Sequence, residues 1–173
     1  MKLYHASTCV IESPDIYHSR ELLDFGKGFY LTNLIEQAKK YALRFTIQGE
    51  QAYLNQYFLD DNLSGYKIKN FQSYDEEWLD YVSLCRIGKQ EVKYDIVAGG
   101  IADDKVFNTV DLYFSGNISK EEALRRLVFI HPNHQNRKYG SKQDNSPNEI
   151  CQSSCCICQT YRSLSRRGFG FFL

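Results

Sequence analysis

The segment Phe25-Gly26-Lys27-Gly28-Phe29-Tyr30-Leu31-Thr32 decides the fold, because it joins a glycine-flanked loop to a short apolar run. Two glycines permit a positive φ or a close approach of the backbone to another group. The run that follows predicts a strand. The pattern is not G-x-G-x-x-G and no G-K-[ST] follows, which excludes the dinucleotide and P-loop fingerprints. The loop is therefore either a tight turn or a way to bring backbone amides and a flat ring to a planar ligand.

Working outward from this segment, the chain alternates between strand and helix patterns. Thr32 or Asn33 can cap a helix that carries apolar residues at helical spacing. Ser73, followed three residues later by Glu76, resembles a capping box at the start of a second helix. Strands are predicted at 1–7, 29–32, 52–59, 66–71 and 94–101, and a third helix is predicted from residue 118. The sum is one mixed α+β domain in which strands outnumber helices.

Composition bounds the class of protein. The chain has 173 residues, 43% of them apolar and 14% aromatic, which excludes a largely disordered chain. It carries 21 Lys+Arg against 21 Asp+Glu, which argues against a general binder of polyanions. No apolar run approaches the roughly 20 residues that a bilayer span needs. The polar start of the chain resembles no secretory leader. We therefore expect a soluble, cytoplasmic protein with no membrane partner.

The C-terminal segment 136–173 differs from the rest of the chain. It carries six Lys+Arg against two Asp+Glu, and it holds Cys151, Cys155, Cys156 and Cys158. No amphipathic period is present, and we expect no packed element there. A zinc site with His131 and His134 is disfavoured because a second CxxC pair is absent, and a disulfide framework does not suit a cytoplasmic chain. An altered reading frame and a poorly ordered native tail both remain open.

Several single residues have simple structural interpretations. Trp78 lies at helical spacing and is predicted to be core. Arg86 is predicted to be a surface residue, with contact to a pyrophosphate as the alternative. Cys9 and Cys85 are predicted to be buried thiols. Taken alone, His5 on the first strand is more often structural than functional.

Two motifs together are more specific. Phe25-Gly26-Lys27-Gly28-Phe29-Tyr30 resembles the F-G-K-G-I-Y segment of the poly(ADP-ribose) polymerases, and Tyr4-His5-Ala6-Ser7 is similar to the H-G-[ST] strand of the same superfamily. The chain most resembles a bacterial family of the DUF3990 type, catalogued as a domain of unknown function. Its E-W-L, Y-D-I-V-x-G-x-I-A-D-D and N-x-Q segments match Glu77–Leu79, Tyr94–Asp104 and Asn133–Gln135. The resemblance covers residues 2 to about 135, which sets the predicted domain as 1–135.

This resemblance implies the H-Y-E branch of the ADP-ribosyltransferases. The implied fold is α+β, a split β-sheet with flanking helices and an NAD cleft. The implied catalytic residues are His5, Tyr30 and Gln135, with Asp104 supplying the charge that Gln135 lacks where the family pattern has Glu. His5 would bind a ribose hydroxyl, the backbone of Ala6 would hold the carboxamide, and Tyr30 with Tyr41 would sandwich the nicotinamide ring. The remaining implied NAD contacts are Ser7, Gly28 and Arg20.

The implied reaction cleaves the nicotinamide–ribose bond of NAD, the co-substrate, and transfers ADP-ribose to a macromolecular acceptor, protein or nucleic acid. No metal is expected. A toxin of a toxin–antitoxin pair, bound by a small antitoxin protein, is one role consistent with this. Two alternatives stay open, an NAD glycohydrolase and a catalytically inactive module that binds NAD or a partner.

Overall fold

Strands from both ends of the sequence meet in one sheet of the computed structural model, which describes residues 1–102, 104–130, 155–159, 164–165 and 171–172. Helices cover a sheet whose strands are mostly antiparallel, which confirms the predicted α+β class. In chain order they are β1 (Lys2–Ser7), β2 (Phe29–Thr32), α1 (Ile35–Ile47), β3 (Tyr53–Leu59), β4 (Ile68–Asn70), α2 (Glu76–Arg86), β5 (Ile96–Gly100), α3 (Asp104–Phe114), α4 (Lys120–Ile130), β6 (Cys155–Gln159), β7 (Leu164–Ser165) and β8 (Phe171–Phe172).

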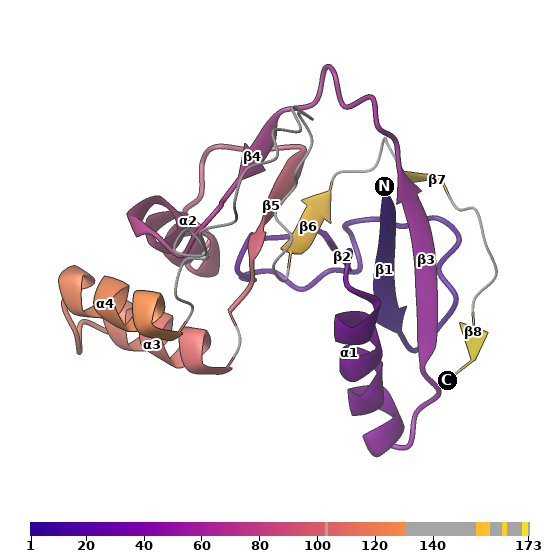
Figure 1. Ribbon diagram of the computed structural model, residues 1–173, viewed down its shortest axis with the longest axis horizontal. Coiled ribbons are helices and arrows are strands. Elements are labelled where there is room, and N and C mark those ends of the chain that lie inside the picture. The colour runs from indigo at the N-terminus through magenta and orange to yellow at the C-terminus, as the bar shows by residue number, and fades with distance from the viewer. Residues whose placement is uncertain (103, 131–154, 160–163, 166–170, 173) are drawn as a thin grey trace, which may run out of the picture.

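The sheet consists of two groups of strands joined by β6. Strands β2, β1 and β3 form an antiparallel group, and β4 and β5 form a parallel pair (Figure 1). Strand β6 lies between them and is antiparallel to both β2 and β5. The full order is β4-β5-β6-β2-β1-β3-β7, and β8 also pairs with β3.

The C-terminal strands differ from the sequence expectation of no packed element after residue 136. A strand placed between two others is held by backbone hydrogen bonds along both of its edges. This arrangement requires no amphipathic pattern, which explains why the sequence did not reveal β6. It also pairs the edges of β2 and β5, which unpaired would be open to other strands.

Side chains alternate between the two faces of the sheet. Leu3, Phe29, Leu31 and Tyr57 pack together on one face, around a core that also contains Ile96 and Ala98 from β5. The opposite face carries the helices, and we call it the helical face. On its β1–β3 half, Ala38 and Ala42 of α1 pack against Ala6 and Leu54.

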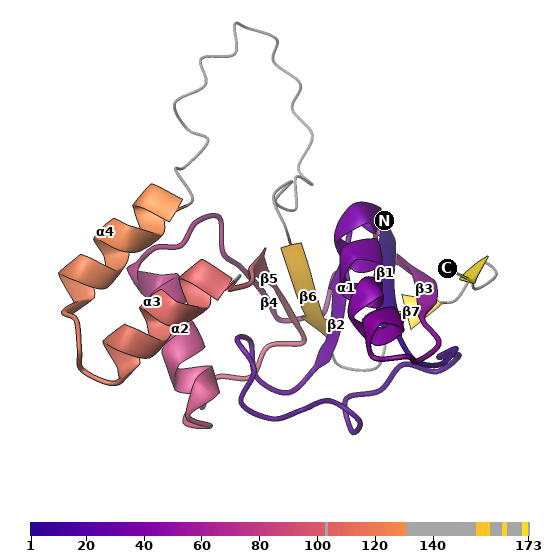
Figure 2. The same cartoon turned by 90° about the horizontal axis from the view of Figure 1, so that it is seen from below.

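The other half of the helical face is covered by α2, α3 and α4. Trp78, Val106, Val110 and Leu127 are fully buried there and pack with Val97 of β5. Figure 2 shows these three helices grouped on one side of β6 and α1 on the other. The prediction that Trp78 belongs to the core is confirmed.

The helix boundaries correct two details of the sequence analysis. Helix α2 is capped by Asp75, whose carboxylate accepts a hydrogen bond from the Trp78 N–H at 3.0 Å, rather than by Ser73. Helix α3 was not predicted, although Val106, Thr109 and Val110 are buried at helical spacing. None of the helices in the described ranges combines the length and apolar character that a membrane span requires.

Candidate functional site

His5 and Tyr30 meet between strands β1 and β2. The Nδ1 of His5 lies 2.7 Å from the backbone carbonyl oxygen of Tyr30, and the imidazole stacks on Phe29 with 4.4 Å between ring centroids. Because a carbonyl only accepts, Nδ1 carries the proton and donates it to this bond. Burial lowers the pKa of His5 below its ordinary value, against the opposing effect of the hydrogen bond to Tyr30. His5 is therefore neutral at pH 7 and its Nε2 is a hydrogen-bond acceptor.

The contact lies where the pairing of β1 with β2 opens. Strand β1 pairs with β3 along its whole length, from Lys2–Phe58 to Ser7–Tyr53. Within the described residues its ladder with β2 contains only the pair Tyr4–Thr32. Beyond that pair, the His5 side chain, rather than the backbone of β1, forms the hydrogen bond to the Tyr30 carbonyl. Ala6, whose backbone the resemblance assigns to a carboxamide, follows His5 on β1 and is buried against Ala38 and Ala42 of α1.

The side chains of His5 and Tyr30 lie on opposite faces of the sheet. His5 shares its face with Phe29, whereas Tyr30 packs at the margin of the core formed by α2, α3 and α4. The Tyr30 hydroxyl donates to the Gly26 carbonyl at 2.8 Å and accepts from the Phe25 N–H at 3.0 Å. Tyr30 thereby closes its own loop, and Gly26 takes the positive φ of 76° that this turn requires.

The remaining part of the glycine loop is held by Ser19. The Gly28 N–H donates to Ser19 Oγ at 3.3 Å, and Gly28 is buried. The side chain of Arg20 is exposed to solvent. Of these two implied NAD contacts, Gly28 is therefore buried within the loop, and Arg20 lies on the surface of the molecule.

Ser7 belongs to a network that the sequence analysis did not identify. Asn55 of β3 is 1% exposed and lies opposite His5 in the sheet register. Its Nδ2 donates to Ser7 Oγ at 3.2 Å and to the Cys9 carbonyl at 3.1 Å, while its Oδ1 accepts from the Ile11 N–H at 2.9 Å. An asparagine at an inward position of an apolar strand was the available signal, because buried polar side chains are usually bonded to something specific.

Tyr41 lies on the exposed side of α1. The residue is 43% exposed; its ring contacts Phe45 edge-on, and the Arg44 guanidinium lies 5.3 Å from the ring centroid. Tyr41 and Tyr30 are both on the helical side of the sheet, since α1 covers the β1–β3 half of that side and Tyr30 lies between this half and the other helices.

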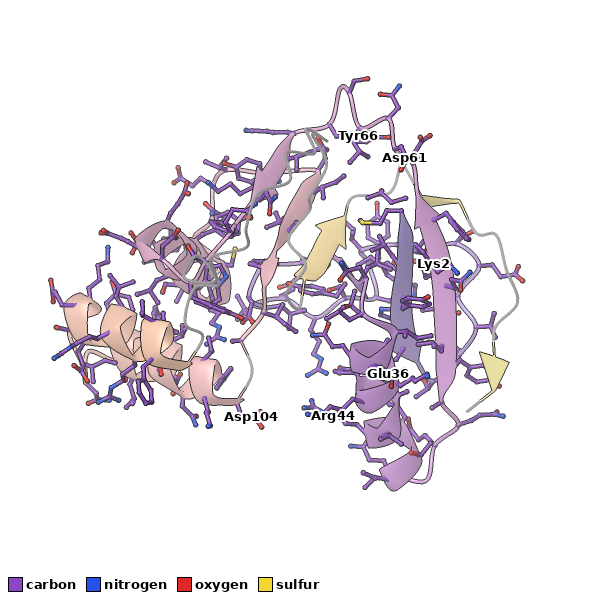
Figure 3. The ribbon with its side chains drawn as sticks, viewed as in Figure 1. Lys2, Glu36, Arg44, Asp61, Tyr66 and Asp104 are labelled. Carbon is purple, nitrogen blue, oxygen red and sulfur yellow. The ribbon has the colours of Figure 1, made fainter. Side chains whose placement is uncertain are left out.

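Asp104 is the first residue of α3 and is exposed. In Figure 3 its side chain extends from the end of α3 that faces α1. Gln135, the third member of the implied triad, lies outside the described residues. So do His131 and His134, the residues considered for the disfavoured zinc site.

A buried ion pair fixes the segment in front of the glycine loop. Arg86 donates from Nε and Nη2 to Asp24 Oδ1, at 3.0 and 2.7 Å, and the Ala102 N–H donates to Asp24 Oδ2 at 2.9 Å. The Arg86 side chain is only 13% exposed, and its guanidinium stacks on Phe107 at 4.4 Å from the ring centroid. The prediction of a surface Arg86 is wrong, because its partner is 62 residues away in the sequence.

A groove of about 310 Å³ lies beside this ion pair. It is lined by Leu22, Leu23, Asp24, Arg86, Phe107, Asp111 and Phe114. None of the implied NAD residues lines it, so this groove is not the NAD cleft that the resemblance implies.

The two predicted buried thiols behave differently. Cys85 is buried, and this burial raises its pKa to about 11, so the thiol stays protonated at neutral pH. Cys9 is exposed, contrary to the prediction, because it follows β1 in the turn that Asn55 holds. In the part of the chain that the structure describes, no group of three or more His, Cys, Asp or Glu side chains is arranged to hold a metal ion.

Comparison with known proteins assigns the N-terminal part of the chain to a family. No curated protein and no solved structure matches the chain. A family model matches residues 1–142, and the description of that family reads "Protein of unknown function (DUF3990)".

Proposed function

The chain belongs to the DUF3990 family, as its motifs predict, and for this member we propose the activity of an NAD-dependent ADP-ribosyltransferase. The proposal rests first on one observation. A neutral histidine on β1 is bonded to the backbone of Tyr30 on β2, at the point where the ladder between these two strands opens. The order and strand positions of His5 and Tyr30 are those that the resemblance to the transferases requires.

The tautomer of His5 suits a ribose hydroxyl. Because Nδ1 is committed to the Tyr30 carbonyl, Nε2 is left to accept a hydrogen bond from such a hydroxyl. The carboxamide of nicotinamide is assigned to the backbone of Ala6, the residue after His5, as the resemblance implies; Ala6 is buried against α1, so this contact requires α1 to give way at Ala6. A ligand that meets both His5 and Tyr30 has to lie in the opening past the Tyr4–Thr32 pair, because their side chains are on opposite faces. The motifs name these two residues but do not restrict the position of the ligand in this way.

The proposed reaction is a substitution at the ribose C1′. The bond from C1′ to the nicotinamide nitrogen breaks, and its electron pair leaves with nicotinamide, whose ring becomes neutral. A nucleophilic atom of the acceptor then bonds to C1′ and releases its proton to solvent. Catalysis consists of holding NAD in place and offsetting the ribosyl cation. We assign the offsetting charge to Asp104, with Gln135 bonding a ribose hydroxyl.

Release of nicotinamide from NAD by the purified full chain tests the proposal. We expect release by the wild type, and a loss of about a hundredfold in His5→Gln and in Asp104→Asn, since each removes a group that the proposal assigns to the reacting sugar. Tyr17→Phe is the control, because Tyr17 is 79% exposed and has no part in the proposed site. Equal release by the wild type and His5→Gln, or no release by folded wild type, would falsify the proposal.

The fate of the ADP-ribose separates transfer from hydrolysis. NAD labelled in its adenosine half is incubated with the chain and a cell lysate. Label on protein or nucleic acid indicates transfer, and free ADP-ribose alone indicates an NAD glycohydrolase. We propose transfer, and an antitoxin-like partner protein belongs to the same proposal.

A second candidate is an NAD-binding module without turnover. The observation that favours it is Gln135, which carries no charge where the family pattern has Glu. Calorimetric binding of NAD with no nicotinamide release supports this candidate and excludes the transferase.

A further inference from the structure

Arg44 and Tyr41 form an exposed pair on α1. They are three residues apart, so their side chains lie on neighbouring positions of the helix surface. The guanidinium of Arg44 lies 5.3 Å from the centroid of the Tyr41 ring, and Tyr41 remains 43% exposed. The contact with the ring, which also meets Phe45 edge-on, favours one orientation of the guanidinium.

The charge of Arg44 is not neutralised within α1. Lys39, on the same helix, is paired with Glu36 at 2.9 Å. Arg44 has no carboxylate partner among the described residues, and its guanidinium lies over the Tyr41 ring. A guanidinium fixed by a ring and free of a carboxylate is suited to bind two oxygens of a phosphate at once.

The position of the pair connects it with the proposed NAD site. Helix α1 packs on Ala6 of β1, and Figure 3 shows the Arg44 side chain extending from α1 on the side that faces Asp104 of α3. Strand β2, which carries Tyr30, lies between the two halves of the sheet that these helices cover. A ligand that reaches from the β1–β2 opening along α1 therefore meets Arg44.

We propose that Arg44, oriented by Tyr41, binds the pyrophosphate of NAD. This inference rests on the proposed function and adds a residue that the motifs do not contain. NAD carries its negative charge on the pyrophosphate, and none of His5, Ala6 or Tyr30 supplies a positive charge to it. Arg44 supplies that charge.

Binding to three probes tests the inference in the full chain. Isothermal titration measures the affinity for NAD, for ADP-ribose and for nicotinamide. We expect Arg44→Gln to weaken NAD and ADP-ribose binding about tenfold, the loss of a hydrogen-bonded charge pair, and to leave nicotinamide binding unchanged. The difference between wild type and Arg44→Gln should shrink at high salt. Arg44→Lys should recover part of the affinity, because it keeps the charge but not the planar fork.

Lys2→Gln is the matched control. Lys2 also lies over an aromatic ring, that of Phe58 at 5.9 Å, and Figure 3 places it on β1, away from the side of α1 that faces α3. We expect this variant to bind all three probes as the wild type does.

Two results overturn the inference, and they are distinguishable. If the wild type binds NAD and Arg44→Gln binds it equally well, Arg44 does not hold the pyrophosphate and the proposed function stands. If folded wild type binds neither NAD nor nicotinamide, the proposed function fails and the inference fails with it. An equal loss for nicotinamide and for ADP-ribose also overturns the inference, because it indicates damage to the whole site.

Discussion

The imidazole of His5 does two things at once. It replaces a missing strand–strand hydrogen bond at the Tyr30 carbonyl, and it leaves Nε2 as an acceptor. The sequence left His5 open between a structural and a functional role, and its position shows that these roles are compatible. The structural role has a measurable consequence, because burial depresses the pKa of the ring.

We predict that His5 makes the stability of the chain depend on pH below about 6.5. The unfolded chain takes up a proton there that the folded chain, with its lowered His5 pKa, does not. Stability from His5 is thus fully present above the unfolded pKa and is lost as the pH falls toward the folded pKa, at about 1.4 kcal/mol per pH unit at most. Urea unfolding between pH 7.5 and 5 measures this slope. His5→Gln should show a flatter slope, and an identical slope in both proteins contradicts the prediction.

The hydroxyl of Tyr30 has a role apart from its ring. It bridges the Gly26 carbonyl and the Phe25 N–H within the glycine loop. We predict that Tyr30→Phe lowers the free energy of unfolding by about 1–2 kcal/mol, since two hydrogen bonds are lost. Chemical denaturation measures the change, and Tyr17→Phe should show none. A Tyr30→Phe variant as stable as wild type would mean that water replaces the hydroxyl without cost.

At the scale of elements, Asp24 connects three segments. It precedes the glycine loop, pairs with Arg86 at the end of α2, and accepts from Ala102 between β5 and α3. The loop that leads to Tyr30 and the segment that leads to Asp104 are therefore held to the same carboxylate.

We predict that Asp24→Asn destabilises the chain by about 3–5 kcal/mol, because Arg86 would remain buried without its counter-charge. Thermal or urea unfolding measures the loss. Lys39→Gln is the matched control, since it breaks the exposed pair with Glu36 and should cost less than about 1 kcal/mol. Similar small losses in both variants would contradict the assignment of Asp24 as the element that joins these segments.

At the scale of the whole molecule, the sheet depends on β6. The antiparallel group β2-β1-β3 and the parallel pair β4-β5 are joined through this strand, which comes from beyond the region that the family model matches. On the helical face each group has its own helices and core, whereas the core on the opposite face contains residues of both groups. Without β6, the edges of β2 and β5 would lose their partner.

We predict that a variant truncated after residue 142 is less stable than the full chain and unfolds in a broader transition, because the two halves of the sheet are no longer joined by backbone hydrogen bonds. Differential scanning calorimetry compares the two proteins. Full stability and a single sharp transition in the truncated variant would show that the matched region folds by itself and that β6 adds nothing.

Local patterns predicted much of the fold. The strand at 29–32 was predicted with the bounds of β2, and the first helix and the strand at 52–59 were located within a few residues. Helix α3 was missed because Asp104 was interpreted for its charge, although the spacing of Val106, Thr109 and Val110 is helical. Asn55 and Asp24 were missed because their partners are 44 to 78 residues away along the chain.

The sequence by itself determined the α+β class, the family, and which residues have the chemistry of a candidate site. These follow from periods of two and of three to four residues and from short motifs, all of which are local. Only the tertiary structure decided that His5 and Tyr30 point to opposite faces, that Arg86 is buried against Asp24, and that β6 joins the sheet. Each of these depends on the pairing of segments far apart in the chain, and side-chain partners and strand order are set by that pairing rather than by local preference.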